Sequence, residues 1–341
     1  MAGIRHLAHR DAGDAVARLG GHRGSPRQVS RASRGSDSPL TGIAFKVASV
    51  TVFVGMSTAI KAAGQVPTGE VVFFRSFFAM IPVLAFLTYR GEFRGGFRTK
   101  RPFSHFARGL VGVTSMGLGF YGLARLPLPE SITINYAQPL LVVVFSALLL
   151  RETIRIYRWS AVVVGLIGVF IVSWPKLTLL GGGGLGGHEA AGAIATLCAA
   201  AASAFAMILV RSLVHTEKTA TIVLWFSLSA TLLSLLTLPF GWVALTAEQA
   251  GLLVMAGICG GVAQLLMTQS YRYAEASVVA PFEYTSMILA IIAGFVVFGD
   301  VPTIHMLVGG AIVVGAGLFI ILRERQLGIE RAAAKTATPP Q

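Results

Sequence analysis

Apolar residues fill most of this chain in blocks of 18 to 24 residues, separated by short polar or charged connections. Each block is long enough to cross a hydrocarbon core of about 30 Å as an α-helix. Backbone groups in lipid must be satisfied within their own segment, which favours helices over strands. The pattern therefore predicts an all-α integral membrane protein with ten transmembrane helices. The predicted spans are 40–61, 69–89, 103–124, 128–150, 158–175, 190–211, 219–242, 249–271, 276–298 and 303–322.

The composition agrees with a protein embedded in a lipid bilayer. Charged residues make up 13% of the chain and hydrophobic residues 54%, with a mean hydropathy of +0.72. Soluble domains carry about 25% charged residues, so an ordinary water-soluble enzyme is excluded. The net charge of +13 resembles that of a nucleic-acid-binding protein, but the charges lie between and outside the apolar blocks, and we expect no nucleic-acid partner. Cys198 and Cys259 lie inside apolar blocks without metal-ligand spacing, and we expect neither a metal nor a cofactor.

Polar segments divide the chain into two halves of five helices each. Residues 1–39 are rich in Arg, Gly and Ser and are predicted to be a disordered cytoplasmic tail. Residues 176–189 contain a run of glycines and are predicted to be an external linker. The expected repeats are therefore 40–175 and 190–322, followed by a cytoplasmic tail at 323–341.

The distribution of positive charge predicts the orientation in the membrane. If the N-terminus is cytoplasmic, 23 of the 28 Lys and Arg residues fall on the cytoplasmic side. Three fall outside (Lys61, Arg125 and Lys176), and Lys46 and Arg75 lie within helices. Because cytoplasmic loops carry the excess of positive charge, we expect a multi-pass inner-membrane protein with both termini in the cytoplasm.

The two halves match each other weakly but in a constant register. A shift of 148 residues places Gly109 on Gly257 and Gly112 on Gly260, and further along it places Asn135-Tyr136 on Glu283-Tyr284 and Glu152 on Asp300. Shifts of 150 and 151 place Lys61 near Arg211 and Ser76 on Ser227. Because five is an odd number of helices, the second half begins on the opposite side of the membrane. The sequence thus predicts two inverted five-helix repeats, an arrangement found in many secondary transporters.

These features resemble the drug/metabolite transporter superfamily, in its EamA-type branch. Two helices that end in a short step before an acidic residue carry the resemblance: ITINYAQPLLVVVFSALLLRET in the first half and VVAPFEYTSMILAIIAGFVVFGD in the second. This chain departs from the pattern at Arg151 (usually Gly), at Asp300 (usually Glu), and at Met287, which replaces the proline found at Pro139 in the first copy. The resemblance implies transport of small metabolites such as amino acids, vitamins or drugs. It also implies a central cavity lined by the first four helices of each half.

Charged residues inside the spans are the first candidates for a transport site. A charge at mid-membrane costs at least about 2.5–3.5 kcal/mol on insertion scales, so it normally faces a cavity or a partner. Glu283 lies seven residues into its helix, just after Pro281, where we expect a kink. It could carry a proton, bind a cationic substrate group, be a buried structural acid, or lie close enough to the interface to snorkel. Arg75 could counter Glu283, bind a substrate carboxylate or snorkel to the interface, whereas Lys46 is expected to be a snorkelling anchor.

A polar cluster repeats at the same depth in both halves. Asn135, Tyr136 and Gln138 mirror Glu283, Tyr284 and Ser286. Such a repeat is typical of a substrate site near the midplane, although polar residues also join helices by hydrogen bonds. Gln264 and Gln269 are weaker candidates that suit helix packing better.

Three classes of function compete for this sequence. An intramembrane enzyme would need a nucleophile–base pair or paired acids at depth, which the spans lack, and there is no Walker-type loop for ATP hydrolysis. A non-transporting scaffold leaves the repeated polar cluster unexplained. We therefore expect a secondary transporter of a small-molecule substrate, with proton coupling through Glu283 as a further expectation. The sequence leaves the substrate, the direction of transport and the oligomeric state open.

Overall fold

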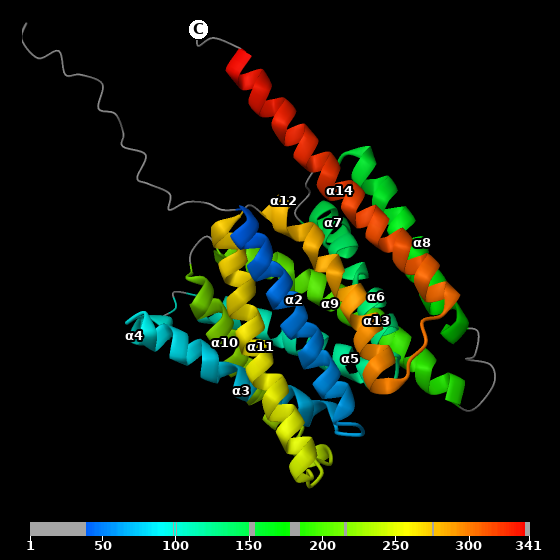
Figure 1. Cartoon of the computed structure of the whole chain (residues 1–341). Coiled ribbons are helices and arrows are strands. Elements are labelled where there is room, and N and C mark those ends of the chain that lie inside the picture. The colour runs from blue at the N-terminus through cyan, green and yellow to red at the C-terminus, as the bar shows by residue number, and fades with distance from the viewer. Residues whose placement is uncertain are drawn as a thin grey trace, which may run out of the picture. The chain divides into compact units, whose positions relative to one another are not determined.

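The computed structural model describes residues 39–97, 99, 101–149, 154–177, 185–214, 217–274 and 276–337. Within these ranges the chain forms helices and connections, and no strand (Figure 1). The predicted N-terminal tail, most of the glycine run and Glu152 lie outside the described residues. The elements are α2 (Pro39–Ala62), α3 (Thr68–Tyr89), α4 (Phe93–Gly96), α5 (Pro102–Leu123), α6 (Leu128–Asn135), α7 (Ala137–Leu149), α8 (Ile156–Leu177), α9 (Leu185–Val214), α10 (Thr219–Leu235), η2 (Leu238–Phe240), α11 (Ala247–Tyr273), α12 (Ala276–Val279), η3 (Ala280–Tyr284), α13 (Thr285–Ala293), η4 (Gly294–Phe298) and α14 (Ile304–Ala337).

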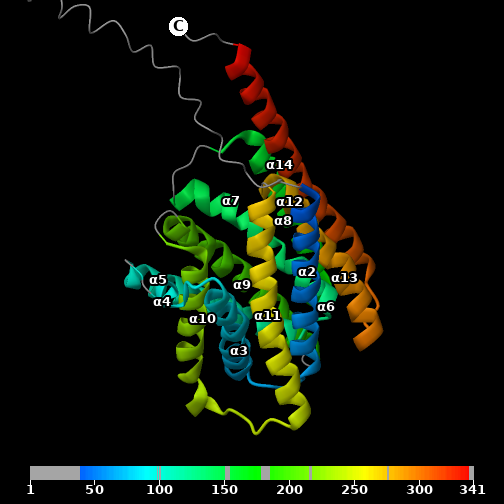
Figure 2. The ribbon, with the colours of Figure 1, turned by 60° about the vertical axis from the view of Figure 1, so that its left-hand side comes forward.

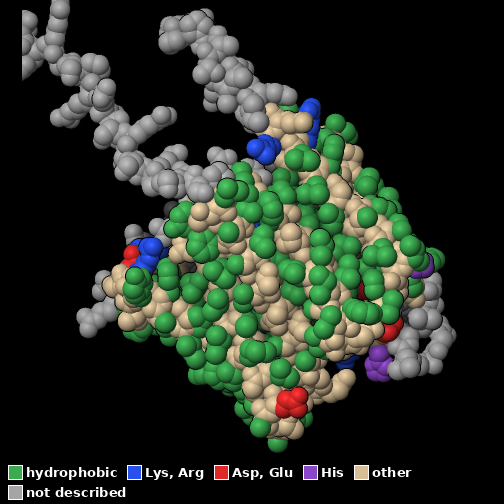
Figure 3. Space-filling model, in the orientation of Figure 1, with side chains coloured by type: hydrophobic (Ala, Val, Ile, Leu, Met, Phe, Trp, Pro, Cys, Tyr) green, Lys and Arg blue, Asp and Glu red, His purple; other side chains and the backbone are tan. Residues whose placement is uncertain are grey.

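The helices have the length and surface of membrane-spanning segments. Among the described residues, eight helical stretches are long and apolar enough to cross a membrane, and Ala220–Leu235 in α10 is a shorter apolar helix. α5 spans 22 residues but carries His105 and Arg108 in its first two turns. Large apolar side chains cover the face of the molecule in Figure 3, and Ile167 and Phe170 of α8 are about half exposed. A surface of this kind is soluble in lipid rather than in water, which indicates a multi-pass membrane protein.

Several helix ends differ from those predicted. α14 continues to Ala337, well into the segment predicted as a tail, and α9 begins at Leu185, inside the predicted linker. The apolar pattern marks only the part of a helix that lies in lipid, so it misses polar extensions. α10 ends earlier than predicted, because Pro239 and the left-handed Gly241 (φ 98°) turn the chain toward α11.

Two of the predicted spans are interrupted at matching positions. The 128–150 span is divided into α6 and α7 at Tyr136, and the 276–298 span passes through the 3₁₀ segment η3 before α13. Pro139 and Pro281 explain the breaks, because proline cannot donate to the carbonyl four residues earlier and its ring clashes with that carbonyl. The kink expected beside Glu283 is therefore present, and a matching break occurs in the first half.

Helices from the two halves pack against each other rather than within separate bundles. α2 lies along α11 and α5 lies along α9, while α3 packs on α10 and α8 on α14 (Figures 1 and 2). One apolar core contains Met56 of α2, Leu128 of α6 and Leu253 of α11. A second core joins Tyr136, Val172 of α8 and Val313 of α14. The candidate site residues lie between these interleaved halves.

Candidate functional site

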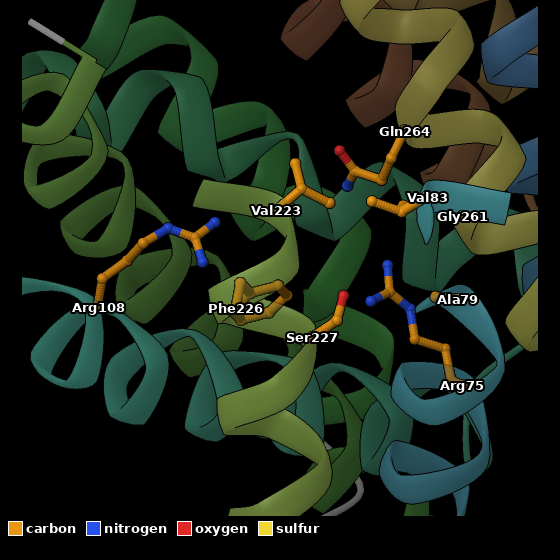
Figure 4. Close-up of a pocket in the computed structure, with 9 residues that line it drawn as sticks. All are labelled: Arg75, Ala79, Val83, Arg108, Val223, Phe226, Ser227, Gly261 and Gln264. Atoms are coloured by element: carbon orange, nitrogen blue, oxygen red, sulfur yellow. The ribbon is translucent and has the colours of Figure 1, made fainter. Parts of the chain in front are cut away.

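A small pocket opens where α3, α5, α10 and α11 meet, and its enclosed part has room for only one or two water molecules (Figure 4). Both halves of the chain contribute side chains to it. Its walls are formed by Arg75, Ala79, Val83, Arg108, Val223, Phe226, Ser227, Gly261 and Gln264. The sequence analysis selected Arg75 as a site candidate and Gln264 as a weaker one, and the fold brings the two together here.

Arg75 is buried in the wall of this pocket. The residue is 6% exposed, and its side chain extends toward Gln264 and Gly261 of α11 (Figure 4). The space beside this side chain is tight, because a Cβ at Gly260 would lie 3.0 Å from Sδ of Met56 and 3.3 Å from Nε of Arg75. Within the described part of the chain, Nε of Arg75 has no hydrogen-bond partner. Arg75 therefore neither snorkels to the interface nor counters Glu283, and its guanidinium remains available to another group.

Arg108 is the second cation of the pocket, and the sequence analysis missed it. Its guanidinium carbon lies 4.3 Å from the ring centroid of Phe226, a cation–π contact. Among the described residues, its Nε and Nη1 are buried without a hydrogen-bond partner. The sequence analysis counted Arg108 with the loop charges, because it lies only six residues after the start of α5. Its position on the helix face that also carries buried His105 was the signal that could have found it.

The polar residues near the two helix breaks form a separate cluster. The hydroxyl groups of Tyr136 and Ser286 are hydrogen-bonded, and the ring of Tyr136 lies 5.1 Å from that of Tyr284 at an angle of 68°. Ser286 Oγ also donates to the carbonyl of Glu283 at 2.7 Å. The hydroxyl of Tyr284 lies against Gly317 of α14, so this side chain fills space beside α14. The cluster joins the two broken helices directly.

The other two members of the predicted cluster lie apart from these contacts. Asn135 is exposed and Gln138 is half-buried. Neither lines the arginine pocket, which is formed by α3, α5, α10 and α11 alone. The structure therefore brings Tyr136 and Tyr284 together, whereas Asn135 and Gln138 stay at the edge of the cluster.

Glu283 forms an ion pair with Lys46, which is not the partner that the sequence suggested. Lys46 Nζ donates to Glu283 Oε2. The Lys46 side chain is 1% exposed and that of Glu283 is 49% exposed. Lys46 is thus a buried cation rather than a snorkelling anchor. The ion pair holds η3 to α2, and its acidic member is half-exposed.

The ion pair lies close behind the arginine pocket. One turn after Lys46, Ser49 Oγ donates to the carbonyl of Ala263 at 2.8 Å. The next residue of α11, Gln264, lines the pocket. α2, which carries Lys46, therefore packs on the helix that contributes Gln264 to the pocket.

Polar networks hold the helices together at both ends of α5. Beyond its C-terminal end, Lys61 Nζ donates to the carbonyl of Leu126 at 2.5 Å and lies 3.9 Å from Asp300. Asp300 Oδ2 also accepts from the amide of Leu128 at 3.2 Å. Near the start of α5, His105 lies 4.0 Å from Glu217. These contacts join the two halves on both sides of the pocket.

Comparisons with known proteins agree with this architecture. An S-adenosylmethionine uptake transporter of Rickettsia bellii is 28% identical, over 75% of this chain and 84% of its own length. A riboflavin transporter of Rhizobium johnstonii is 28% identical, over 84% of this chain and 89% of its own. The pseudopaline exporter CntI of Pseudomonas aeruginosa is also 28% identical, over 81% of this chain and 94% of its own. A solved crystal structure shares the fold, with a TM-score of 0.60 and 21% identity over 84% of this chain and 99% of that one.

The family assignment rests on a match that covers most of the chain. The model of the EamA-like transporter family matches twice, over residues 40–174 and 190–323. Each match spans one of the two halves that pack against each other. The family resemblance inferred from the helix-end motifs is thereby confirmed: this protein belongs to the EamA-like transporter family.

Proposed function

We propose that this chain is a secondary active transporter that moves a small metabolite across the inner membrane by alternating access. The observation that carries the proposal is the arginine pocket between the two halves of an EamA-like chain. Transporter sites typically lie where repeats meet, and both halves of the chain line this pocket. The relatives named for S-adenosylmethionine, riboflavin and pseudopaline suggest a small polar or amphipathic substrate. Membership of a transporter family also favours this function over the enzyme and scaffold alternatives.

The proposed architecture is ten transmembrane helices in two inverted repeats, 40–175 and 190–322. An exchange of equivalent contacts supports the repeat. Gly42 of α2 packs on Ser270 of α11, and Gly192 of α9 packs on Gly122 of α5. In the repeat register, Gly42 corresponds to Gly192 and Gly122 corresponds to Ser270, so the two contacts are equivalent. Each contact pairs one half with the other in the opposite order, which is the pattern that a two-fold axis between the halves produces.

The direction of the equivalent helices α8 and α14 supports an inverted repeat. Gly165 of α8 contacts Ala316 of α14, and Val172 contacts Gly309, so the two helices run antiparallel. Equivalent helices that run antiparallel are related by an axis perpendicular to them, which in a membrane lies in the bilayer plane. The excess of Lys and Arg in loops on one side supports cytoplasmic termini.

We further propose that Glu283 is the proton-binding group. A proton on Glu283 would remove the negative charge that faces the buried ammonium of Lys46, which costs free energy. Proton binding would thereby loosen η3 from α2 beside the pocket. The broken helices would then move, and the residues that position them and contact the substrate would be Tyr136, Tyr284, Asn135 and Gln138.

Transport by purified protein tests the proposed function. The protein is reconstituted into liposomes, and uptake of radiolabelled S-adenosylmethionine, riboflavin and a panel of amino acids is measured with and without a pH gradient. Saturable uptake of at least one compound, above that of protein-free liposomes, is expected. Absence of uptake and of counterflow for every compound would refute the proposal.

A further inference from the structure

The arginine pocket has two cations, Arg75 and Arg108, and no acidic residue among its described lining residues. Glu283 pairs with Lys46, and Glu217 lies beside His105. Within the described part of the chain, neither Arg75 nor Arg108 has an acidic partner, and both have buried N–H groups without a hydrogen-bond acceptor. Charged residues inside a membrane normally pair or face a cavity, so this arrangement favours an anion from outside the protein.

The chemistry of the lining specifies what kind of anion fits. A guanidinium is a planar fork of donors that matches the two oxygens of a carboxylate or phosphate. Ser227 and Gln264 add a hydroxyl and an amide beside Arg75 (Figure 4). An apolar wall is formed by the aromatic Phe226 and the aliphatic Ala79, Val83 and Val223. The pocket therefore suits the carboxylate or phosphate group of a ligand, with an apolar wall beside it.

The pocket is asymmetric although the fold repeats. Both arginines come from the first half, whereas the repeat register places Phe226 at the position of Arg75 and Ala256 at that of Arg108. The second half therefore supplies no charge to the pocket; it contributes the apolar Val223 and Phe226 together with the neutral polar Ser227 and Gln264. A ligand in this pocket would have its anionic end toward α3 and α5 and its apolar end toward α10.

We propose that this pocket binds the carboxylate or phosphate group of the transported metabolite, with Arg75 and Arg108 as its ligands. This inference rests on the proposed transport function and narrows it to substrates that carry an anionic group. S-adenosylmethionine has a carboxylate and fits this class, whereas riboflavin has no anionic group and does not.

Anion binding is tested on full-length protein in nanodiscs of phosphatidylcholine, which carry no net charge. Benzoate and phenyl phosphate serve as probes, and benzamide is the neutral analogue at equal ionic strength. Both anions should raise the melting temperature saturably, and benzamide should not. Arg75→Gln and Arg108→Gln should each weaken the apparent affinity by at least about 30-fold, as expected for loss of one partner of a buried charge pair.

Matched variants separate binding from folding. Arg90→Gln removes an arginine that stacks on Phe86 outside the pocket and should bind the anions as the wild type does. Arg75→Lys keeps the charge and should retain part of the affinity. Arg75→Gln and Arg108→Gln each remove a buried charge and should not lower the melting temperature without ligand. A lower melting temperature without ligand would therefore identify a folding defect.

Three binding results and one transport result would overturn the inference. Benzamide could stabilise as well as benzoate, or the arginine variants could bind the anions like the wild type. Alternatively, only phosphatidylglycerol added to the nanodiscs could stabilise in an arginine-dependent way, which would mean that the pocket holds a lipid headgroup. Transport tests the function separately: uptake of S-adenosylmethionine should exceed that of its decarboxylated analogue, and uptake of riboflavin 5′-phosphate should exceed that of riboflavin. Wild-type protein that transports only the members without an anionic group leaves the transport function standing and refutes the anion site.

Discussion

Removing either partner of the Lys46–Glu283 ion pair should have unequal effects on stability. Glu283→Gln leaves the ammonium of Lys46, whose side chain is 1% exposed, without its counter-charge. Breaking a fully buried ion pair lowers the free energy of unfolding by about 3–5 kcal/mol. Because the Glu283 side chain is 49% exposed, we expect a loss of about 2–3 kcal/mol for Glu283→Gln. Lys46→Met instead leaves a carboxylate that can recruit solvent and adds an apolar side chain at a buried position. We expect a loss below about 1 kcal/mol for that variant.

The double variant Lys46→Met/Glu283→Gln completes a thermodynamic cycle. It contains neither charge and should lie within about 1 kcal/mol of the wild type, so the coupling energy should be about 1–5 kcal/mol. Melting temperatures of purified protein in detergent provide the measurement, and at roughly 2–4 °C per kcal/mol the Glu283→Gln shift is resolvable. The exposed pair Lys218–Glu92, at 3.2 Å, is the matched control and should show coupling below about 1 kcal/mol.

The double variant also separates stability from proton coupling. If Glu283 binds the proton, this well-folded variant should lose uptake driven by a pH gradient and keep exchange at equal pH. A Lys46→Met variant less stable than Glu283→Gln would refute the burial argument. Normal gradient-driven uptake by the double variant would refute the proton-carrier role of Glu283.

Two further predictions test packing and orientation. Gly257→Ala should destabilise the protein by about 1–3 kcal/mol in a thermal melt, because its Cβ would lie 2.5 Å from Cβ of Phe78 and 2.8 Å from a backbone carbonyl. Gly251→Ala on the same helix is the control: its Cβ meets nothing within 4 Å, so it should be neutral or stabilising. In intact cells, with the native cysteines replaced, a cysteine at Ala244 should react with an impermeant thiol reagent and one at Gly95 should not; the reverse labelling would show that the charge count predicts the wrong orientation.

The sequence predicted the helices well because lipid imposes a simple rule on composition. Every apolar block coincides with helical structure, and the break at Pro281 follows from one missing donor. The break at Tyr136 was not predicted, although Pro139 explains it afterwards. Helix ends were less accurate, as α14 shows, because hydropathy reports the lipid boundary rather than the helix end.

The site was only partly predictable because it depends on contacts between distant segments. Arg75 was selected by its charge within an apolar block, but its partner residues in α10 and α11 follow from packing alone. Lys46 and Glu283 are 237 residues apart in sequence, and no local pattern indicates that they pair. Arg108 was overlooked because a charge near a helix end has the same sequence signature whether it points to water or into a pocket.

The interleaving of the two halves has a consequence for biosynthesis. The ribosome delivers α2 to the membrane first. Its neighbour α11, to which Ser49 donates a hydrogen bond, begins only at Ala247. Glu283, the partner of Lys46, follows later still. Throughout synthesis of the first half, the ammonium of Lys46 therefore lies in a nascent helix that lacks its final neighbours. Insertion and assembly are consequently separate events for this protein. A chain cut short by a premature stop would insert its helices and still expose an unpaired cation and an unpacked helix face to membrane quality-control proteases.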